Sequence, residues 1–471
     1  MPREKLKWRP HKSESTDAEH RGGPTRSSEE VSVMEMERRG WIIQLALKNN
    51  RIREESLEKA KPFEISKQTV WEAWKHVKAN RGAAGVDAES IADFEENLKD
   101  NLYKIWNRMS SGSYFPPPVK TVAIPKKTGG ERKLGIPTVT DRIAQMVVKL
   151  HFEPLVEPHF HEDSYGYRPK KSAIQAVGIT RKRCWRYDWL LEFDIKALFD
   201  NIRHDLLMQA VRHHTKCTWI LLYIERWLKA PFQREDGSLV ERPQGTPQGG
   251  VISPVLANLF LHYVFDKWMD RNHPGNPFCR YADDAVVHCR TEAEALALKE
   301  GLDARFKECG LELHPDKTKI VYCRDDRRRR EYPDRNFDFL GFTFRPRLAK
   351  SRKGILFLNF SPAISNKAAK MMREKARQWK IHRHSDKSLE DLSRRYSPVI
   401  RGWINYYGSF YKSLLIRTMR HLNRILFRWA MRKFKKMKRH PRRAEYWLGR
   451  IARRQPWLFP HWKIGANPVA G

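Results

Sequence analysis

Apolar residues recur every three or four positions in the first quarter of the chain, a spacing that predicts amphipathic helices. This periodicity begins near residue 35, and the clearest helices are expected over 63–78 and 91–109. Residues 1–33 lack such a period and are polar, mixed in charge and poor in aliphatic side chains. We expect this segment to be disordered, or to become ordered only on RNA.

The pattern changes to that of a strand at residues 119–125, followed by a basic, glycine-containing turn and a return at 134–137. This predicts a hairpin with a basic tip that leads into a helix over 140–152. Between residues 190 and 323, short strands alternate with helices. The alternation favours an antiparallel sheet backed by helices over a parallel, doubly wound sheet.

Strand signals fade after about residue 365, and long basic amphipathic helices replace them. Within 411–463, 17 Lys and Arg residues stand against one acidic residue, Glu445. A solvated helix face normally mixes both signs of charge, so this stretch predicts a surface that follows nucleic-acid phosphates. The apolar face of one helix is predicted from Leu415, Leu422, Leu426 and Trp429, and its RNA-binding face from Arg417, Arg420, Arg424 and Arg428. Trp447, Trp457 and Trp462 could each anchor a core or stack on bases, and a core position is favoured for any one of them.

The charge balance of the whole chain points to the same class of partner. Its 471 residues include 91 Lys and Arg against 55 Asp and Glu, a formal net charge of +36. Such an excess favours a polyanion, because each neutralised phosphate releases counterions. Nucleic acid is favoured over a membrane surface, since no apolar run reaches the roughly 18 residues of a membrane span and the amino terminus lacks a signal-peptide core. We therefore expect an intracellular, cytoplasmic protein with no membrane partner.

The six cysteines are widely spaced, and none forms a C-x-x-C pair. Buried single thiols in a reducing compartment are the expected state. A zinc-bound module is not expected, because its ligands usually come as paired cysteines.

Two adjacent carboxylates, Asp283 and Asp284, stand at what is predicted to be the tip of a short apolar hairpin over 278–289. Alone, the pair could be a solvated turn, because Asp is common in turns. A third carboxylate, Asp194, lies in the apolar segment 190–200, where burial of a charge needs a reason. Convergence of the three would create a site for two divalent cations of the kind that activate a 3′-hydroxyl and stabilise a leaving pyrophosphate. An all-oxygen site of this kind suits Mg²⁺.

Several segments, in order, resemble the palm motifs of reverse transcriptases. They are FDIKALFD at 193–200, PQGTPQGGVISP at 243–254 and YADD at 281–284. Supporting segments include IPK at 124–126, GIPT at 135–138, SYGYRP at 164–169 and FLGF at 339–342. The segment IRGWINYYG at 400–408 is similar to the maturase, or X, domain that serves as the thumb. The best resemblance is to the reverse transcriptase/maturases encoded by group II introns, in the type that lacks the endonuclease.

The resemblance implies an α+β fold: a right-hand polymerase with fingers and an antiparallel palm sheet, followed by an α-helical thumb. The implied ranges are an N-terminal extension over 1–33, N-terminal helices and fingers over 34–185, palm over 186–350, thumb or maturase domain over 365–435 and a basic, Trp-rich tail over 436–471.

The resemblance also implies roles for single residues. Asp194, Asp283 and Asp284 would be catalytic metal ligands, with the Ile195 carbonyl as a further ligand and Lys317 as a general acid toward pyrophosphate. Lys126, Arg132, Phe199 and Gln248 would contact the incoming nucleotide, the Phe199 ring by excluding a 2′-hydroxyl. Gly249, Gly250 and Gly341 would contact the template and primer.

The expected function is RNA-directed DNA synthesis with two Mg²⁺ ions, for which Mn²⁺ could substitute, together with binding of intron RNA that promotes splicing and mobility. The expected partners are group II intron RNA, a DNA target and primer, and dNTPs, and a homodimer is left open. Two alternatives also stay open: a maturase that only supports splicing, and a domesticated or defence-linked reverse transcriptase. The absence of paired cysteines after Cys323 predicts no zinc-bound endonuclease and a primer made elsewhere.

Overall fold

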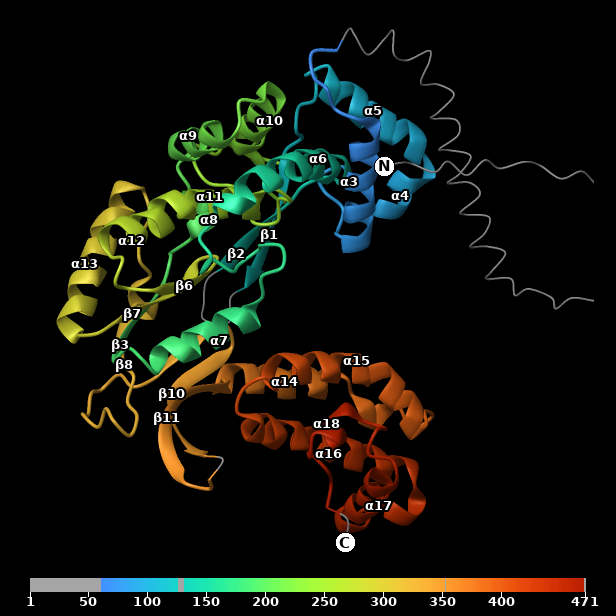
Figure 1. The fold of residues 1–471 in the computed structure, drawn as a ribbon. Coiled ribbons are helices and arrows are strands. Elements are labelled where there is room, and N and C mark those ends of the chain that lie inside the picture. The colour runs from blue at the N-terminus through green and yellow to red at the C-terminus, as the bar shows by residue number, and fades with distance from the viewer. Residues whose placement is uncertain (1–60, 126–130, 352, 470–471) are drawn as a thin grey trace, which may run out of the picture. The chain divides into compact units, whose positions relative to one another are not determined.

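The computed structural model describes residues 61–125, 131–351 and 353–469, and residues 63–471 form one compact unit (Figure 1). The prediction for residues 1–33 lies outside the described residues. Within the described parts of the chain, no helix is long and apolar enough to cross a membrane.

The compact unit begins with helices that pack on a long central helix. Helix α3 (Lys67–Asn80) is capped by Ser66, whose hydroxyl accepts a hydrogen bond from the backbone of Thr69. It packs against α6 (Val139–Val156). The single helix predicted over 91–109 is two helices, α4 (Ile91–Glu96) and α5 (Leu98–Ser110), because Asn97 leaves the helical conformation between them.

The hairpin predicted near residue 125 is confirmed. Strands β1 (Val119–Pro125) and β2 (Glu131–Ile136) pair in antiparallel fashion. Strand β1 also pairs in parallel with the short strand β4 (Phe232–Gln233), which turns back through β5 (Leu239–Val240).

Residues 189–322 contain a four-stranded sheet of order β6-β7-β3-β8 in which every neighbouring pair is antiparallel, as predicted. Its strands are β3 (Trp189–Asp194), β6 (Phe278–Tyr281), β7 (Asp284–Cys289) and β8 (Lys319–Tyr322). The helices of this region are α7 (Ala173–Cys184), α8 (Leu198–Asn201), α9 (His204–His214), α10 (Thr218–Lys229), α11 (Ser253–Leu261), α12 (Lys267–Asn272) and α13 (Glu292–Glu308).

The two faces of this sheet belong to different cores, because successive side chains of a strand point to opposite faces. Leu191 and Phe193 of β3 join the large core formed with α11 and α13. Leu190 of β3 and Val286 of β7 join a second core with α7 and with phenylalanines from residues 337–360. By the same alternation, Asp194 and Asp284 lie on the face of this second core.

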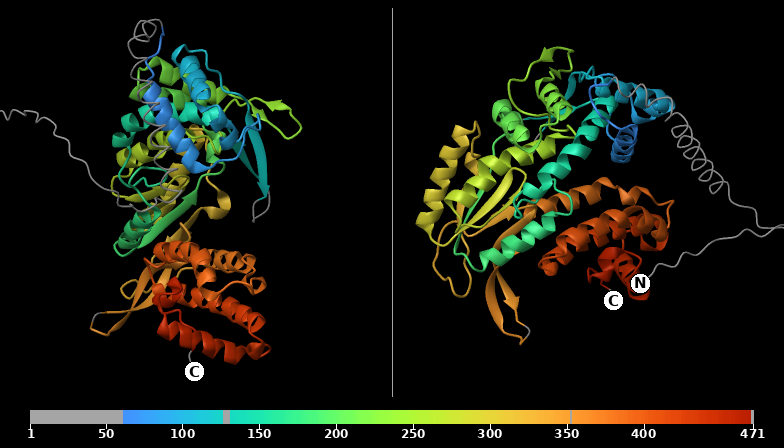
Figure 2. Two further views of the ribbon diagram at one scale, coloured as in Figure 1. Left: turned by 90° about the vertical axis from the view of Figure 1, so that its right-hand side faces the viewer. Right: turned by 45° about the horizontal axis from the view of Figure 1, so that its top comes forward.

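The following sheet has the order β11-β10-β9 and leads into the C-terminal helices. Its strands are β9 (Phe337–Phe339), β10 (Phe342–Lys350) and β11 (Leu356–Ile364). The helices are α14 (Asn366–Gln378), α15 (Leu389–Tyr407), α16 (Lys412–Lys433), α17 (Pro441–Arg454) and α18 (Pro460–Lys463). Figure 2 shows these helices, in orange to red, from two further directions.

One core joins all the C-terminal helices, and it includes Leu415 and Trp429 of α16 together with Leu448 and Trp462. The predicted tail over 436–471 is therefore an integral part of the helical domain. Trp462 is buried and Trp447 packs partly buried on this core, as favoured from the sequence, whereas Trp457 is 70% exposed.

Candidate active site

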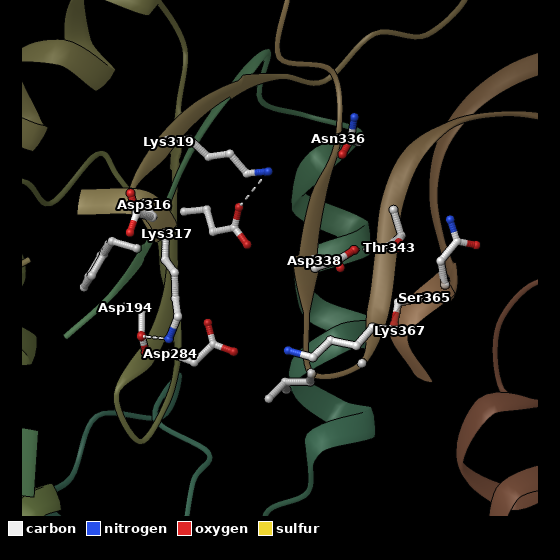
Figure 3. A pocket seen from close by; sticks show the side chains of 15 residues that line it. Asp194, Asp284, Asp316, Lys317, Lys319, Asn336, Asp338, Thr343, Ser365 and Lys367 are labelled. Atoms are coloured by element: carbon white, nitrogen blue, oxygen red, sulfur yellow. Dashed lines mark hydrogen bonds and ion pairs between the residues drawn. The ribbon is translucent and has the colours of Figure 1, made fainter. Parts of the chain in front are cut away.

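A cavity of about 590 Å³ lies beside strands β3 and β7 and extends to the turn between β9 and β10 and the start of α14 (Figure 3). It brings together four residues singled out in the sequence: Asp194, Asp284, Lys317 and Gly341. Glu192, Asp338 and Lys319 also line it, so the cavity has a concentration of carboxylates faced by lysines.

Asp194 and Asp284 are direct partners in the antiparallel register of β3 and β7. Side chains at such positions lie on the same face with Cβ atoms about 5 Å apart. Burial of the Asp284 carboxyl raises its pKa well above the usual value, and the charges of Asp194, Glu192 and Asp283 raise it further, while Lys317 acts in the opposite direction. The energetic cost of ionising this site is what a bound cation would relieve.

Asp283 stands in the tight turn between β6 and β7. Its carbonyl accepts a hydrogen bond from the backbone N–H of Ile195 at 3.2 Å, which ties the turn to the end of β3. Among the described residues, those that line the cavity include Asp284 but not Asp283. In the same parts of the chain, no group of three or more His, Cys, Asp and Glu residues forms a metal site by itself. The three-carboxylate set, with the Ile195 carbonyl, stays a prediction.

Lys317 provides a cation at this site. Its ammonium group donates a hydrogen bond to Asp194 Oδ2, and the dashed line in Figure 3 marks this contact. The contact is supported by the chain itself, since the backbone N–H of His314 donates to the Asp194 carbonyl at 2.8 Å. An all-oxygen pair of aspartates that already attracts an internal cation fits a hard divalent ion.

Glu192 is a site residue that sequence reasoning missed. It lies two residues before Asp194 on β3 and therefore on the same face, and only 8% of it is exposed. Its Oε2 lies 3.5 Å from the ammonium of Lys319. Burial raises the pKa of Glu192 to about 7, although Lys319 lowers it. The signal that could have revealed it is the alternation of the strand, which predicts the same face for positions 192 and 194.

A second cavity, of about 430 Å³, contains the other predicted nucleotide and template residues. Phe199 and Gln248 line it together with Gly249 and Gly250. Gly249 has a φ of +131°, and a Cβ there would lie 2.3 Å from the carbonyl oxygen of Gly135. The need for glycine at 249 is thus explained within the protein, by close contact with β2.

Two predicted nucleotide contacts cannot be placed in this way. Lys126 lies outside the described residues. Arg132 belongs to β2, where its backbone pairs with Ile124, and its side chain lies outside the description.

The predicted RNA-binding arginines all lie on α16 and are exposed. The apolar face predicted from the same helix is confirmed, because Leu415, Leu422, Leu426 and Trp429 are buried. Burial lowers the pKa of His421 on α16, and the nearby charges of Arg377, Arg424, Arg373 and Arg428 lower it further, so arginines of α14 and α16 lie close to one another.

The chain is similar to several known proteins. Residues 124–344 match the family described as reverse transcriptase (RNA-dependent DNA polymerase), and residues 369–447 match the group II intron, maturase-specific domain. The protein YkfC of Escherichia coli is 33% identical over 302 residues, which cover 55% of this chain and 78% of YkfC. The group II intron-encoded protein LtrA of Lactococcus lactis is 35% identical over 200 residues, covering 42% of this chain and 33% of LtrA. A structure of telomerase from Candida albicans aligns over 78% of this chain and 69% of that chain, with 11% identity and a TM-score of 0.41.

The site and the matched domains define a reverse transcriptase. More closely, the chain belongs to the family of group II intron reverse transcriptase/maturases. The fold class, enzyme class and family predicted from the sequence are confirmed.

Proposed function

We propose that the chain copies RNA into DNA by adding dNTPs to a primer, with Mg²⁺ held by Asp194, Asp284 and Asp283. The observation that carries this proposal is the register of Asp194 opposite Asp284 in a cavity that Gly341 also lines. Two carboxylates on one face of the palm sheet supply the oxygen ligands that Mg²⁺ requires. Mn²⁺ substitutes in the same site.

Bound Mg²⁺ supplies Lewis-acid stabilisation of the attacking and leaving oxygens. Residues of the chain bind the primer and the nucleotide and transfer the proton. Gly341 and its turn hold the primer end, and Phe199 and Gln248 hold the nucleotide in the second cavity, where the Phe199 ring excludes a 2′-hydroxyl. Lys317, when released from Asp194, donates a proton to the departing pyrophosphate.

The exposed arginines of α16 bind the phosphates of intron RNA, which makes the helical domain the maturase part of the protein. In this role the chain acts inside the cell as a ribonucleoprotein and promotes splicing and insertion at a DNA target. A splicing-only maturase would differ from this proposal by lacking polymerase activity. An intron-free enzyme would differ in the RNA that it binds.

Single-nucleotide addition to a DNA primer on an RNA template tests the proposal. Asp284→Asn is expected to lower the rate by about 10²- to 10³-fold, the scale of losing one electrostatic stabilising group. Asp303→Asn is the matched control, because Asp303 is on α13 and pairs with Lys307 at 2.6 Å. RNA binding should be equal in the wild type and in these two variants. Equal rates for Asp284→Asn and Asp303→Asn would contradict the proposal.

A further inference from the structure

The turn that bears the catalytic carboxylates has a backbone that needs external support. Ala282, which precedes Asp283, has a φ of +58°. Residues other than glycine adopt this left-handed conformation at a cost, and they keep it where the surrounding structure fixes it.

Arg280 lies on strand β6, two residues before Ala282, and is almost fully buried. Its Nε and Nη2 donate to the two carboxylate oxygens of Asp266 at 2.8 and 2.6 Å. Its Nη1 donates to Asn258 Oδ1 at 3.1 Å and to the Ala282 carbonyl at 3.3 Å. One guanidinium therefore joins the α11–α12 region to the backbone of the turn.

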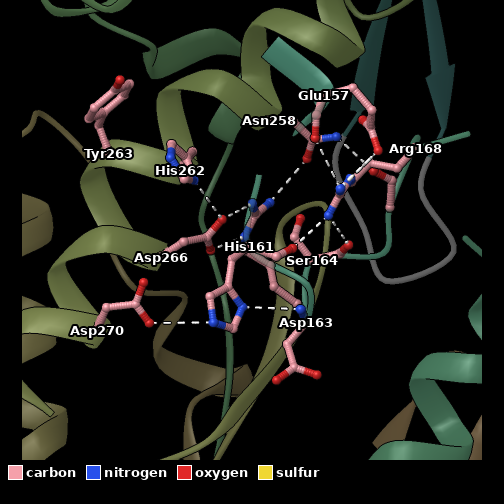
Figure 4. Close-up of polar contacts among 12 residues, drawn as sticks. Glu157, His161, Asp163, Ser164, Arg168, Asn258, His262, Tyr263, Asp266 and Asp270 are labelled. Atoms are coloured by element: carbon pink, nitrogen blue, oxygen red, sulfur yellow. Dashed lines mark hydrogen bonds and ion pairs between the residues drawn. The ribbon is translucent and has the colours of Figure 1, made fainter. Parts of the chain in front are cut away.

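The helix that carries Asp266 is locally widened where Asp266 contacts Arg280. Residues His262–Asp266 form a π-helical turn between α11 and α12. Such turns are uncommon and occur frequently at functional sites. Figure 4 shows Asn258, His262 and Asp266 gathered in this cluster of polar contacts. Burial alone would raise the pKa of Asp266, but Arg280 outweighs it and lowers the pKa below its usual value, so the pair is charged.

The loop around Gly166 also packs against the turn. Asn258 Nδ2 donates to the Gly166 carbonyl at 2.7 Å, and the backbone N–H of Tyr165 donates to the Arg280 carbonyl at 2.8 Å. A Cβ at Gly166 would lie 2.4 Å from the backbone nitrogen of Ala282. The loop thus approaches the nitrogen of Ala282, while Arg280 holds its carbonyl.

We infer that Arg280, held by Asp266 and Asn258, is a positioning residue that fixes the Ala282 turn and thereby the directions in which Asp283 and Asp284 project. In this role Arg280, which is almost fully buried, acts through its contact with the backbone of the turn. The inference rests on the proposed polymerase function, and its test includes a measurement that does not need that activity.

The test must separate positioning from stability, because removing Arg280 alone would leave a buried, unpaired Asp266. The double variant Arg280→Met/Asp266→Leu removes both charges and is expected to melt close to the wild type, since apolar replacement of a buried pair is often neutral. Its maximal rate of nucleotide addition should fall by about 10- to 100-fold through misplacement of the carboxylates. The KM for dNTP and the affinity for primer–template should stay near those of the wild type.

The matched control is Arg328→Met/Asp325→Leu. Arg328 also pairs with a carboxylate and donates to two backbone carbonyls, those of Tyr187 and Cys184, but it lies away from the turn. A second variant and its control change no charge. The added Cβ of Gly166→Ala would clash with the backbone of Ala282, whereas that of Gly275→Ala meets nothing within 4 Å. Gly166→Ala should lower the rate, and Gly275→Ala should not.

Hydrogen–deuterium exchange of the metal-free full chain gives the independent measurement. Amides of residues 281–285 should exchange faster in Arg280→Met/Asp266→Leu and in Gly166→Ala than in the controls, while β8 exchanges as in the wild type. Unchanged exchange at the turn, or rates equal to those of the two controls, would overturn the inference. If the wild type itself does not extend primers, the proposed function fails, and the exchange result still decides the positioning role.

Discussion

The ammonium of Lys317 donates a hydrogen bond to Asp194, a contact between residues that are 123 positions apart in the chain. Asp194 is also the register partner of Asp284. A single aspartate therefore faces both a lysine and a second carboxylate. Any divalent ion that binds Asp194 must compete with Lys317.

Replacing Lys317 with Met is expected to increase metal affinity. More than half of the Lys317 side chain is exposed, so its ion pair with Asp194 is weak. Loss of this ion pair should tighten metal binding by up to about fivefold. Mn²⁺ titration of the purified full chain measures the effect. Lys319→Met is the comparison, because Lys319 lines the same cavity but pairs with Glu192. Weaker Mn²⁺ binding by Lys317→Met would show that the lysine does not compete. A fall in the maximal rate of nucleotide addition would support its separate role as a general acid.

Shortening Phe199 is expected to relax the choice of sugar. The ring is 7% exposed and lines the second cavity with Gln248, where a smaller side chain leaves room for a 2′-hydroxyl. For Phe199→Val, the ratio of kcat/KM for ribonucleotides to that for deoxynucleotides should rise by about 10- to 100-fold. Phe357→Val makes the same change on strand β11 and should leave the ratio unaltered. An unchanged ratio in Phe199→Val would assign the ring to the core alone.

Local patterns along the chain were enough to predict the main architecture. The alternation at 119–125 and 134–137 predicted the β1–β2 hairpin, and the apolar segments around Asp194 and Asp284 predicted neighbouring strands of an antiparallel sheet. These predictions succeed because strand periodicity and turn chemistry are short-range properties.

Features that depend on tertiary packing were not predictable in the same way. The pairing of Lys317 with Asp194 needs the fold to bring distant segments together. The shared core of Trp462 and α16 likewise made the predicted tail part of the helical domain. The break at Asn97 within an apparently continuous helical pattern shows that periodicity alone does not fix element boundaries.

The arginine face of α16 predicts a salt-dependent contact with RNA. Arg424→Ala/Arg428→Ala removes two exposed cations from one face, which should weaken binding and reduce the slope of log affinity against log salt by about 1 to 2. Lys267→Ala/Lys299→Ala removes two exposed lysines from palm helices α12 and α13 and controls for net charge alone. RNA binding measured from low to high salt distinguishes them. Equal slopes in the two double variants would indicate that the α16 arginines do not contact phosphates.

Buried His461 predicts that the helical domain loses stability in mild acid. Its Nε2 lies 2.9 Å from Asn423 Oδ1, and burial lowers the pKa of His461 from 6.5 to about 3. Below pH 6.5 the unfolded chain takes up a proton that the folded chain does not accept until about pH 3. The free energy of unfolding should therefore fall as the pH falls through this range, by up to about 1.4 kcal/mol per pH unit.

His461→Gln keeps a donor for Asn423 and removes the titrating group. Urea unfolding at pH 7.5 and pH 5.5 should show a loss of stability that is smaller in His461→Gln than in the wild type by about 1 kcal/mol. His288, whose pKa burial also lowers to about 3, contributes equally to both proteins and cancels in the comparison. His440→Gln, at an exposed position before α17, should retain the wild-type dependence. If His461→Gln loses as much stability as the wild type between the two pH values, His461 is not the group responsible.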